Sequence, residues 1–157
     1  MNKNTKEKIC AFYASDYHFE MMSLPYIDKK MGEKEEVIIL TENNLEETMQ
    51  KVLKSTNFKE EKKQQIINLN WKNNDLEKFK KMKEKIKEEK ELTIFIKGRE
   101  NYIHNIHQNI ERWIPEKQKV KIIDCYAMEE IGENLEKIIN KYSKILKITG
   151  EKEIEKI

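Results

Sequence analysis

Cysteine, glycine and long hydrophobic runs are all scarce in this chain of 157 residues. The two cysteines, Cys10 and Cys125, are too few for a disulfide framework, and we expect both to be reduced. Only four glycines occur, and neither GxGxxG after the first expected strand nor GxxxxGKS/T is present, so standard dinucleotide and P-loop sites are not expected. The longest apolar run, Ile9 to Ala14, is far shorter than the roughly 20 residues that cross a bilayer.

Charge of one sign is also lacking, because 31 Lys plus Arg stand against 29 Asp plus Glu. The basic residues are nearly all lysines interleaved with glutamates, which is typical of a solvated surface and gives no indication of nucleic-acid binding. The N-terminus MNKNTKEK is not followed by the apolar stretch and cleavage site of a secretory signal. We therefore expect a cytoplasmic protein that does not associate with a membrane.

Short apolar segments alternate with stretches of helical periodicity, which is the pattern of βαβ units and a parallel sheet. We expect an α/β fold with three layers (α/β/α) and a five-stranded, mostly parallel sheet in the flavodoxin-like or receiver-like order 2-1-3-4-5. The five expected strands are Lys8–Ala14, Glu36–Leu40, Ile66–Leu69, Leu92–Ile96 and Val120–Ile123. Residues 8–148 would form a single domain, with a flexible N-terminus (1–7) and a C-terminal tail (149–157).

The helices are expected in the intervening segments. The first covers Phe19–Met31 and contains Pro25, which predicts a kink or a late start. The others are a helix capped by Asn43 or Asn44, a short surface helix between Ser55 and Gln65, a helix over Leu76–Lys90 capped by Asp75, a helix stopped by Pro115, and a long last helix over Ile131–Leu146.

The order of elements is similar to that of response-regulator receiver domains, and INLNWKNNDLEKFKKMKEKIKEEKELTIFIKG resembles their third strand, third helix and fourth strand. Receivers carry paired acids after the first strand and a phosphate-accepting Asp after the third. Here Asp16 is a single acid and Asn70 stands at the acceptor's place. Lys97 and Asp124 replace the family's Ser or Thr and its Lys. The resemblance thus implies a shared architecture without phosphoryl transfer.

Polar residues just beyond the strands' carboxyl ends are the candidate site, because these ends converge on one crevice in an open parallel sheet. Lys97, Gly98 and Arg99 offer two cations before a helix N-terminus, which attracts anions. A plainer reading has Gly98 making the turn while Arg99 pairs with Glu100 or Asp124. The expected ligand-binding residues are Asp16, Tyr17, His18, Asn43, Lys97, Arg99 and Asp124.

Two groups of residues suggest chemistry only weakly. Asp16 and His18, near Glu20, are the candidate catalytic residues, with His18 carrying a proton and Asp16 orienting it; alternatively Asp16 caps the helix and His18 packs in its first turn. His104 and His107 could be half of a metal site, but no further ligands follow at a recognisable offset, so no metal site is predicted. The sequence indicates no particular cofactor.

Two functions follow from these patterns. The first is the binding of a small anionic ligand, a nucleotide among the options, at the carboxyl-terminal edge of the sheet. The alternative is a receiver-like protein-interaction module that cannot be phosphorylated and has no catalytic activity, with a protein partner or a second copy of the chain on a helix face or the tail. An enzyme built on Asp16 and His18 is a third option.

Overall fold

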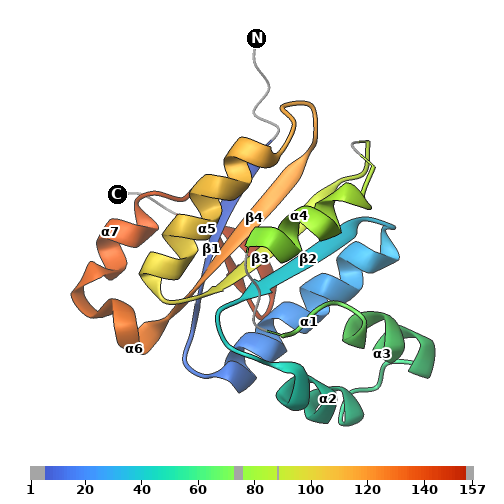
Figure 1. Cartoon of the computed structure of the whole chain (residues 1–157). Coiled ribbons are helices and arrows are strands. Elements are labelled where there is room, and N and C mark those ends of the chain that lie inside the picture. The colour runs from blue at the N-terminus through green and yellow to red at the C-terminus, as the bar shows by residue number, and fades with distance from the viewer. Residues whose placement is uncertain (1–5, 73–75, 88, 155–157) are drawn as a thin grey trace.

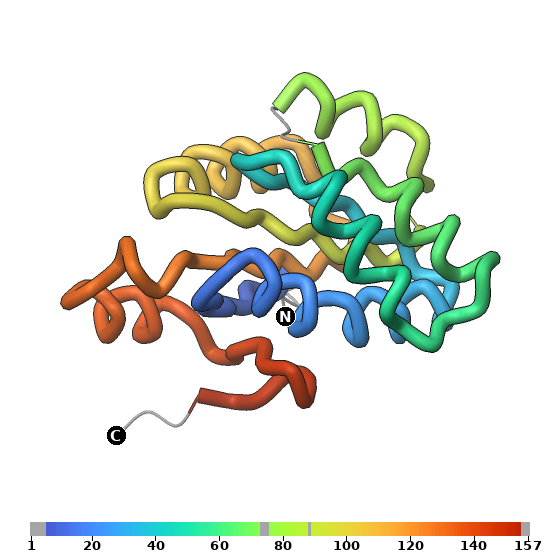
Figure 2. Tube along the Cα trace, turned by 90° about the horizontal axis from the view of Figure 1, so that it is seen from below, coloured from blue at the N-terminus to red at the C-terminus, as the bar shows by residue number. Residues whose placement is uncertain are grey.

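The computed structural model describes residues 6–72, 76–87 and 89–154, and its helices pack around a single β-sheet (Figure 1). Within these residues the sheet has six strands in the order β2-β3-β4-β1-β5-β6, and only β6 runs antiparallel to its neighbour. The strands are β1 (Lys6–Tyr13), β2 (Glu36–Thr41), β3 (Leu92–Gly98), β4 (Val120–Ala127), β5 (Lys144–Lys147) and β6 (Gly150–Glu153). In Figure 2 the β5–β6 hairpin, in red, lies at the border of the fold.

The central strands are rich in buried apolar residues because helices cover both of their faces. Every residue of β3 is buried, including Thr93 and Lys97. Alternate residues of β3 then belong to different cores: Phe95 packs with the core on one face, and Ile94 and Ile96 with the core on the other. Successive residues of this strand therefore pack into the two cores on opposite faces of the sheet.

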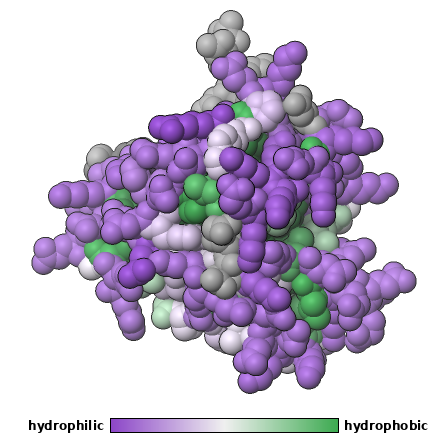
Figure 3. Space-filling model, viewed as in Figure 1, coloured by the Kyte–Doolittle hydropathy of each residue, from purple (hydrophilic) through white to green (hydrophobic). Residues whose placement is uncertain are grey.

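The helices divide between these faces. One core holds residues of the first three helices, and the other holds residues of the later ones. On the first face lie α1 (Asp16–Gly32), α2 (Glu46–Lys54) and α3 (Glu60–Ile67); on the second lie α4 (Leu76–Glu84), α5 (Glu100–Trp113), α6 (Met128–Ile131) and α7 (Leu135–Ile139). The face seen in Figure 3 is mostly hydrophilic, with hydrophobic groups in small areas only. No helix in the described part of the chain is long and apolar enough to span a membrane.

The path of the chain creates a change of direction beside β1. After β1, α1 carries the chain past β4 and β3 to the edge strand β2, and the next strands return toward β1. The connection that leaves β1 therefore lies on one face, while those that leave β3 and β4 lie on the other. In open α/β sheets, the carboxyl ends of strands at such a point form a crevice.

The expected α/β class with a mostly parallel sheet is confirmed, but five strands in the order 2-1-3-4-5 is wrong. The expected strand at Ile66–Leu69 is instead the end of α3 and the turn after it. Its apolar residues serve a helix, since Ile66 is buried in the α1-side core and its carbonyl accepts a hydrogen bond from the Trp71 indole at 2.7 Å. Periodicity cannot separate a short apolar strand from a short buried helix end.

The expected long last helix at Ile131–Leu146 is also wrong. The segment breaks into α6, a 3-10 turn over Gly132–Asn134 and α7, and its last apolar residues enter β5. Gly132 has φ of 45°, a left-handed conformation that glycine adopts at little cost. Residues 150–153, expected in a tail, form β6.

Helix α1 begins earlier than expected, at Asp16, and runs through Pro25. Ser15 caps it, because its hydroxyl accepts a hydrogen bond from the His18 backbone N–H at 3.1 Å. The helix expected to reach Lys90 ends at Glu84. Its expected cap, Asp75, lies outside the described residues, as do positions 1–5 of the expected flexible N-terminus.

Phe95 tests the α1-side core. Its fully buried ring meets Phe19 and Tyr26 edge-on, with centroids 6.4 and 5.9 Å away. Phe95→Ala should lower the free energy of unfolding by about 3–5 kcal/mol, because it removes these contacts and leaves a cavity. The exposed Ile148 is the control, and Ile148→Ala should change it by no more than about 0.5 kcal/mol. Equal losses in urea denaturation of the two variants would contradict this packing.

Candidate functional site

A cavity of about 340 Å³ lies at the carboxyl ends of β1, β2, β3 and β4. We call it the crevice. It sits beside the point where the connections leaving β1 and β4 diverge to opposite faces, which is where open α/β sheets bind ligands. The crevice is lined by Tyr13, Asp16, Glu42, Asn43, Lys97, Gly98, Arg99, Ala127 and Glu130.

Lys97 places a buried ammonium group in the crevice. Its side chain is only 2% exposed, and its Nζ lies 2.9 Å from both Asp16 Oδ1 and Asn43 Oδ1. The Asn43 amide also donates to Asp16 Oδ2 at 3.2 Å, so the three side chains bond one another pairwise. The Tyr13 ring lies 4.6 Å from Nζ and adds a cation–π contact. The buried charge is tolerated because it is paired and hydrogen-bonded.

Arg99 and Glu42 form a second ion pair at the more exposed side of the crevice. Arg99 Nε and Nη2 donate to Glu42 Oε2 at 3.1 and 2.8 Å, and its backbone N–H donates to Oε1 at 2.9 Å. These hydrogen bonds hold the pKa of Glu42 below its usual value of 4.5, although partial burial opposes this. The Arg99 side chain is still 68% exposed, so its guanidinium can reach a ligand.

Glu20 is buried next to this network. It is 1% exposed, and Oε2 has no hydrogen-bond partner among the residues that the structure describes. Burial raises the pKa of Glu20 above its usual 4.5, while a hydrogen bond from Thr48 and the charge of Lys97 oppose this in part. Sequence reasoning weighed Glu20 only as a neighbour of His18. Its inward position follows from helix spacing, because Phe19, Ser23 and Ile27 are buried on the same helix.

The structure brings together four of the expected ligand-binding residues, Asp16, Asn43, Lys97 and Arg99. Tyr17 is 62% exposed on α1 and does not line the crevice. His18 Nδ1 accepts a hydrogen bond from the Ala14 backbone N–H at 2.9 Å. The proposed catalytic pair, Asp16 and His18, thus have different partners: Asp16 bonds Lys97 and Asn43, whereas His18 bonds the backbone before its own helix.

Asp124, the seventh expected ligand-binding residue, lies elsewhere. It faces α5 in the middle of β4, where it is 1% exposed. His107 Nδ1 lies 2.8 Å from its Oδ2, and the Tyr142 hydroxyl donates to the same oxygen at 2.6 Å. Tyr126 and Tyr142 share a hydrogen bond of 2.6 Å, and His107 Nε2 lies 2.9 Å from Glu111 Oε1. These five residues form a polar network under α5.

This polar network was missed as a unit, although the sequence carries a signal for it. His107 falls four residues after Ile103 and three before Ile110 on the buried stripe of α5, and Asp124 alternates with Ile122 and Tyr126 on one face of β4. His107 and Asp124 thus both lie at inward-facing positions, and α5 packs on β4. In the described part of the chain, no three His, Cys, Asp or Glu side chains are arranged to hold a metal ion.

Gly98 tests the packing of the crevice. A Cβ at this position would lie 2.8 Å from Glu42 Oε1 and 2.7 Å from Tyr102 Cδ1. Gly98→Ala should therefore displace Glu42 from Arg99 and lower the free energy of unfolding by about 1–3 kcal/mol. Gly32→Ala is the matched control, because a Cβ there meets nothing within 4 Å. Similar denaturation curves for the two variants would show that Gly98 is not closely packed.

His107 predicts a pH dependence of stability. Burial alone lowers the pKa of this imidazole, but the hydrogen bond and charge of Asp124, with the charge of Glu111, raise it above the usual 6.5 overall. The protonated form is favoured in the folded state, so its contribution is complete below about pH 6.5 and is lost as pH rises through the folded-state pKa.

Urea denaturation as a function of pH should therefore show the free energy of unfolding falling as pH rises above about 6.5. The decline should disappear in His107→Gln and persist in His104→Gln, because His104 is exposed on the same helix. A parent protein whose stability stays constant or rises across this range would contradict the assignment.

Comparison with known proteins assigns no family or function to this chain. No family model, no curated protein and no solved structure matches it. The function therefore has to be inferred from the residues of the site and their chemistry.

Proposed function

We propose that the protein binds a small anionic molecule that also carries hydroxyl groups, the chemistry of nucleotides and sugar phosphates, in the crevice. The observation that carries the proposal is the pairing of a buried cation with an exposed one: Lys97 lies in the interior of the crevice and Arg99 at its exposed side. The crevice also occupies the usual ligand position of an open α/β sheet. Its 340 Å³ is within the range of small-molecule sites.

The charge balance of the crevice indicates what the ligand must offer. Each cation already has an acidic partner, Asp16 for Lys97 and Glu42 for Arg99, and Glu130 adds a third acid. A bare anion would meet more negative than positive side chains. A ligand with an anionic group and several hydroxyls suits this set better, because hydroxyls donate to carboxylates while the anionic group takes the basic donors.

The start of α5 supports the position of the anionic group beside Arg99. Arg99 is the N-cap residue of this 14-residue helix, and its side chain makes no capping hydrogen bond. The first backbone N–H groups of a helix carry partial positive charge, which favours a nearby anion. The anionic group would then lie beside Arg99, which also holds Glu42, with hydroxyls toward Asp16 and Asn43.

The receiver-like interaction module is the second candidate. It is favoured by Tyr17 and Met21, exposed apolar side chains one turn apart on α1. Neither residue lines the crevice, so the two functions do not require the same side chains. The two buried free thiols, Cys10 and Cys125, accord with the cytoplasmic location that forms part of the proposal.

The two arginines of the chain provide a matched test. Arg99→Gln should weaken binding of the best ligand from a panel of nucleotides and sugar phosphates by roughly tenfold or more, because charge-assisted hydrogen bonds are lost. Arg112→Gln has the same charge change on an exposed site of α5 and should bind like the parent. Calorimetric titration and thermal shift measure both. No stabilisation of the parent by any member, or equal binding by the two variants, would refute the proposal.

A further inference from the structure

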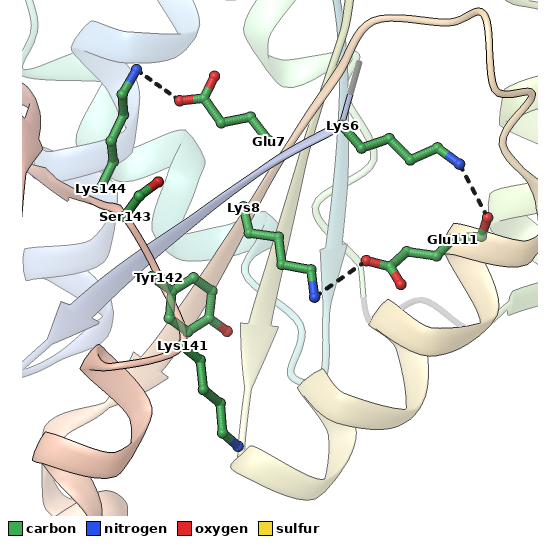
Figure 4. A pocket seen from close by; sticks show the side chains of 8 residues that line it. All are labelled: Lys6, Glu7, Lys8, Glu111, Lys141, Tyr142, Ser143 and Lys144. Atoms are coloured by element: carbon green, nitrogen blue, oxygen red, sulfur yellow. Dashed lines mark hydrogen bonds and ion pairs between the residues drawn. The ribbon is translucent and has the colours of Figure 1, made fainter. Parts of the chain in front are cut away.

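A second cavity, of about 840 Å³, lies over the first half of β1, between α5 and the connection from α7 to β5 (Figure 4). We call it the basic groove. Its charged lining consists of Lys6, Lys8, Lys141 and Lys144 with Glu7 and Glu111. The lysines outnumber the acids four to two, whereas acids outnumber bases in the crevice.

The basic groove exists because one face of β1 is not fully covered. Helix α7 ends at Ile139, and the chain then returns to the sheet as β5 at Lys144. Lys8 and Cys10 lie on the same face of β1, since side chains alternate along a strand. Cys10 is fully buried, while the Lys8 side chain is 51% exposed. A lysine thus occupies a core-facing position where the helical cover stops.

The acids of the basic groove are already engaged. Lys144 Nζ lies 2.7 Å from Glu7 Oε1, and Glu111 Oε1 is 2.9 Å from His107 Nε2 and 3.4 Å from Lys8 Nζ. Burial lowers the pKa of His107, but Asp124 and Glu111 raise it overall. The protonated imidazole then offsets the negative charge of Glu111, to which it is hydrogen-bonded. The carboxylates therefore leave cationic charge at the opening.

Lys8 and Lys141 are the two cations best placed for a ligand. They reach the opening from different elements, and both also line a smaller cavity of about 230 Å³ that continues toward His107 and Asp124. In Figure 4 no dashed line joins Lys141 to another residue drawn, and among the described residues no hydrogen bond or ion pair is found for its ammonium. Two ammonium groups that line one opening suit an anion with several negative oxygens.

We propose that the basic groove is a second binding site, for an oxyanion with two or more negative charges such as a phosphate ester or a polycarboxylate, held between Lys8 and Lys141. It is separate from the proposed function, because the crevice lies at the carboxyl ends of the strands and this site at the start of β1. The two sites share no lining residue. Either can therefore fail without the other.

The test uses pyrophosphate and citrate as probes at low ionic strength, where screening is weakest. Two-dimensional amide NMR of the parent should show shifts that saturate with either probe and centre on residues 6–8, 107–111 and 141–144. The double variant Lys8→Gln, Lys141→Gln should bind roughly tenfold more weakly or worse, because two charge-assisted contacts are removed. Lys141→Gln alone should lose part of this affinity, and it changes no contact of the folded chain that the structure describes.

Three controls separate the basic groove from general charge. Lys51→Gln with Lys54→Gln makes the same charge change on the exposed side of α2 and should bind like the parent. Arg99→Gln should also bind the probes like the parent, whereas it should lose the ligand of the crevice. A preference for pyrophosphate or for citrate tells the phosphate class from the carboxylate class.

Equal loss in both lysine pairs would mean attraction by net charge and would overturn the proposal. Shifts that centre on residues 97–100, or that do not saturate, would overturn it too. Loss of probe binding in Arg99→Gln with retention in the Lys8, Lys141 pair would assign the probes to the crevice instead.

Discussion

The buried ion pair of Lys97 with Asp16 is the contact on which the geometry of the crevice depends. Lys97 belongs to β3 and Asp16 to the first turn of α1, and β4 separates β3 from β1 in the sheet. The pair can form because α1 crosses β4 and β3 on its way to β2, on the face toward which Lys97 points. The crossover thus positions an acid from one strand connection above the end of a strand two places away. Replacing Asp16 would leave the buried Lys97 ammonium without its ion-pair partner, which is costly.

The sequence predicts which crevice residues follow strand ends, but it does not predict which of them contact one another across the sheet. It predicts that Asp16, Asn43, Lys97 and Arg99 follow strand ends, because apolar runs and capping residues mark those ends. It also predicts that parallel strand ends gather at one edge. It does not predict that Arg99 pairs with Glu42, because that depends on which strand adjoins β3, and strand order is set by tertiary packing. The expected order 2-1-3-4-5 placed the first strand between Glu36–Leu40 and the expected strand at Ile66–Leu69, whereas β1 lies between β4 and β5.

The errors at Ile66–Leu69 and Ile131–Leu146 have one physical cause. Both segments carry enough apolar residues to be buried, but burial of a short segment is compatible with helix or strand. For the first, α1 and the indole of Trp71 select a helix end. For the second, residues 144–147 form a strand that pairs in parallel with β1, where Ile9 and Cys10 align with Lys144 and Ile145. The local sequence pattern predicts neither the packing against α1 and Trp71 nor the pairing with β1.

The polar network under α5 and the ion pairs of the crevice both stabilise buried charged side chains, but in different ways. In the crevice the partners come from the end of β3, the start of α1 and the residues that follow β2 and β3, and they line a cavity. Under α5 the partners come from β4, from one face of α5 and from Tyr142 in the connection between α7 and β5. The network therefore ties these three segments together before it reaches the surface at Glu111. Protonation of His107 strengthens that tie and at the same time offsets the acid in the basic groove. An anion bound between Lys8 and Lys141 would in turn favour the protonated imidazole, because a nearby negative charge stabilises a cation. Anion binding at this site and protonation of His107 would thus be thermodynamically linked, so that each would favour the other.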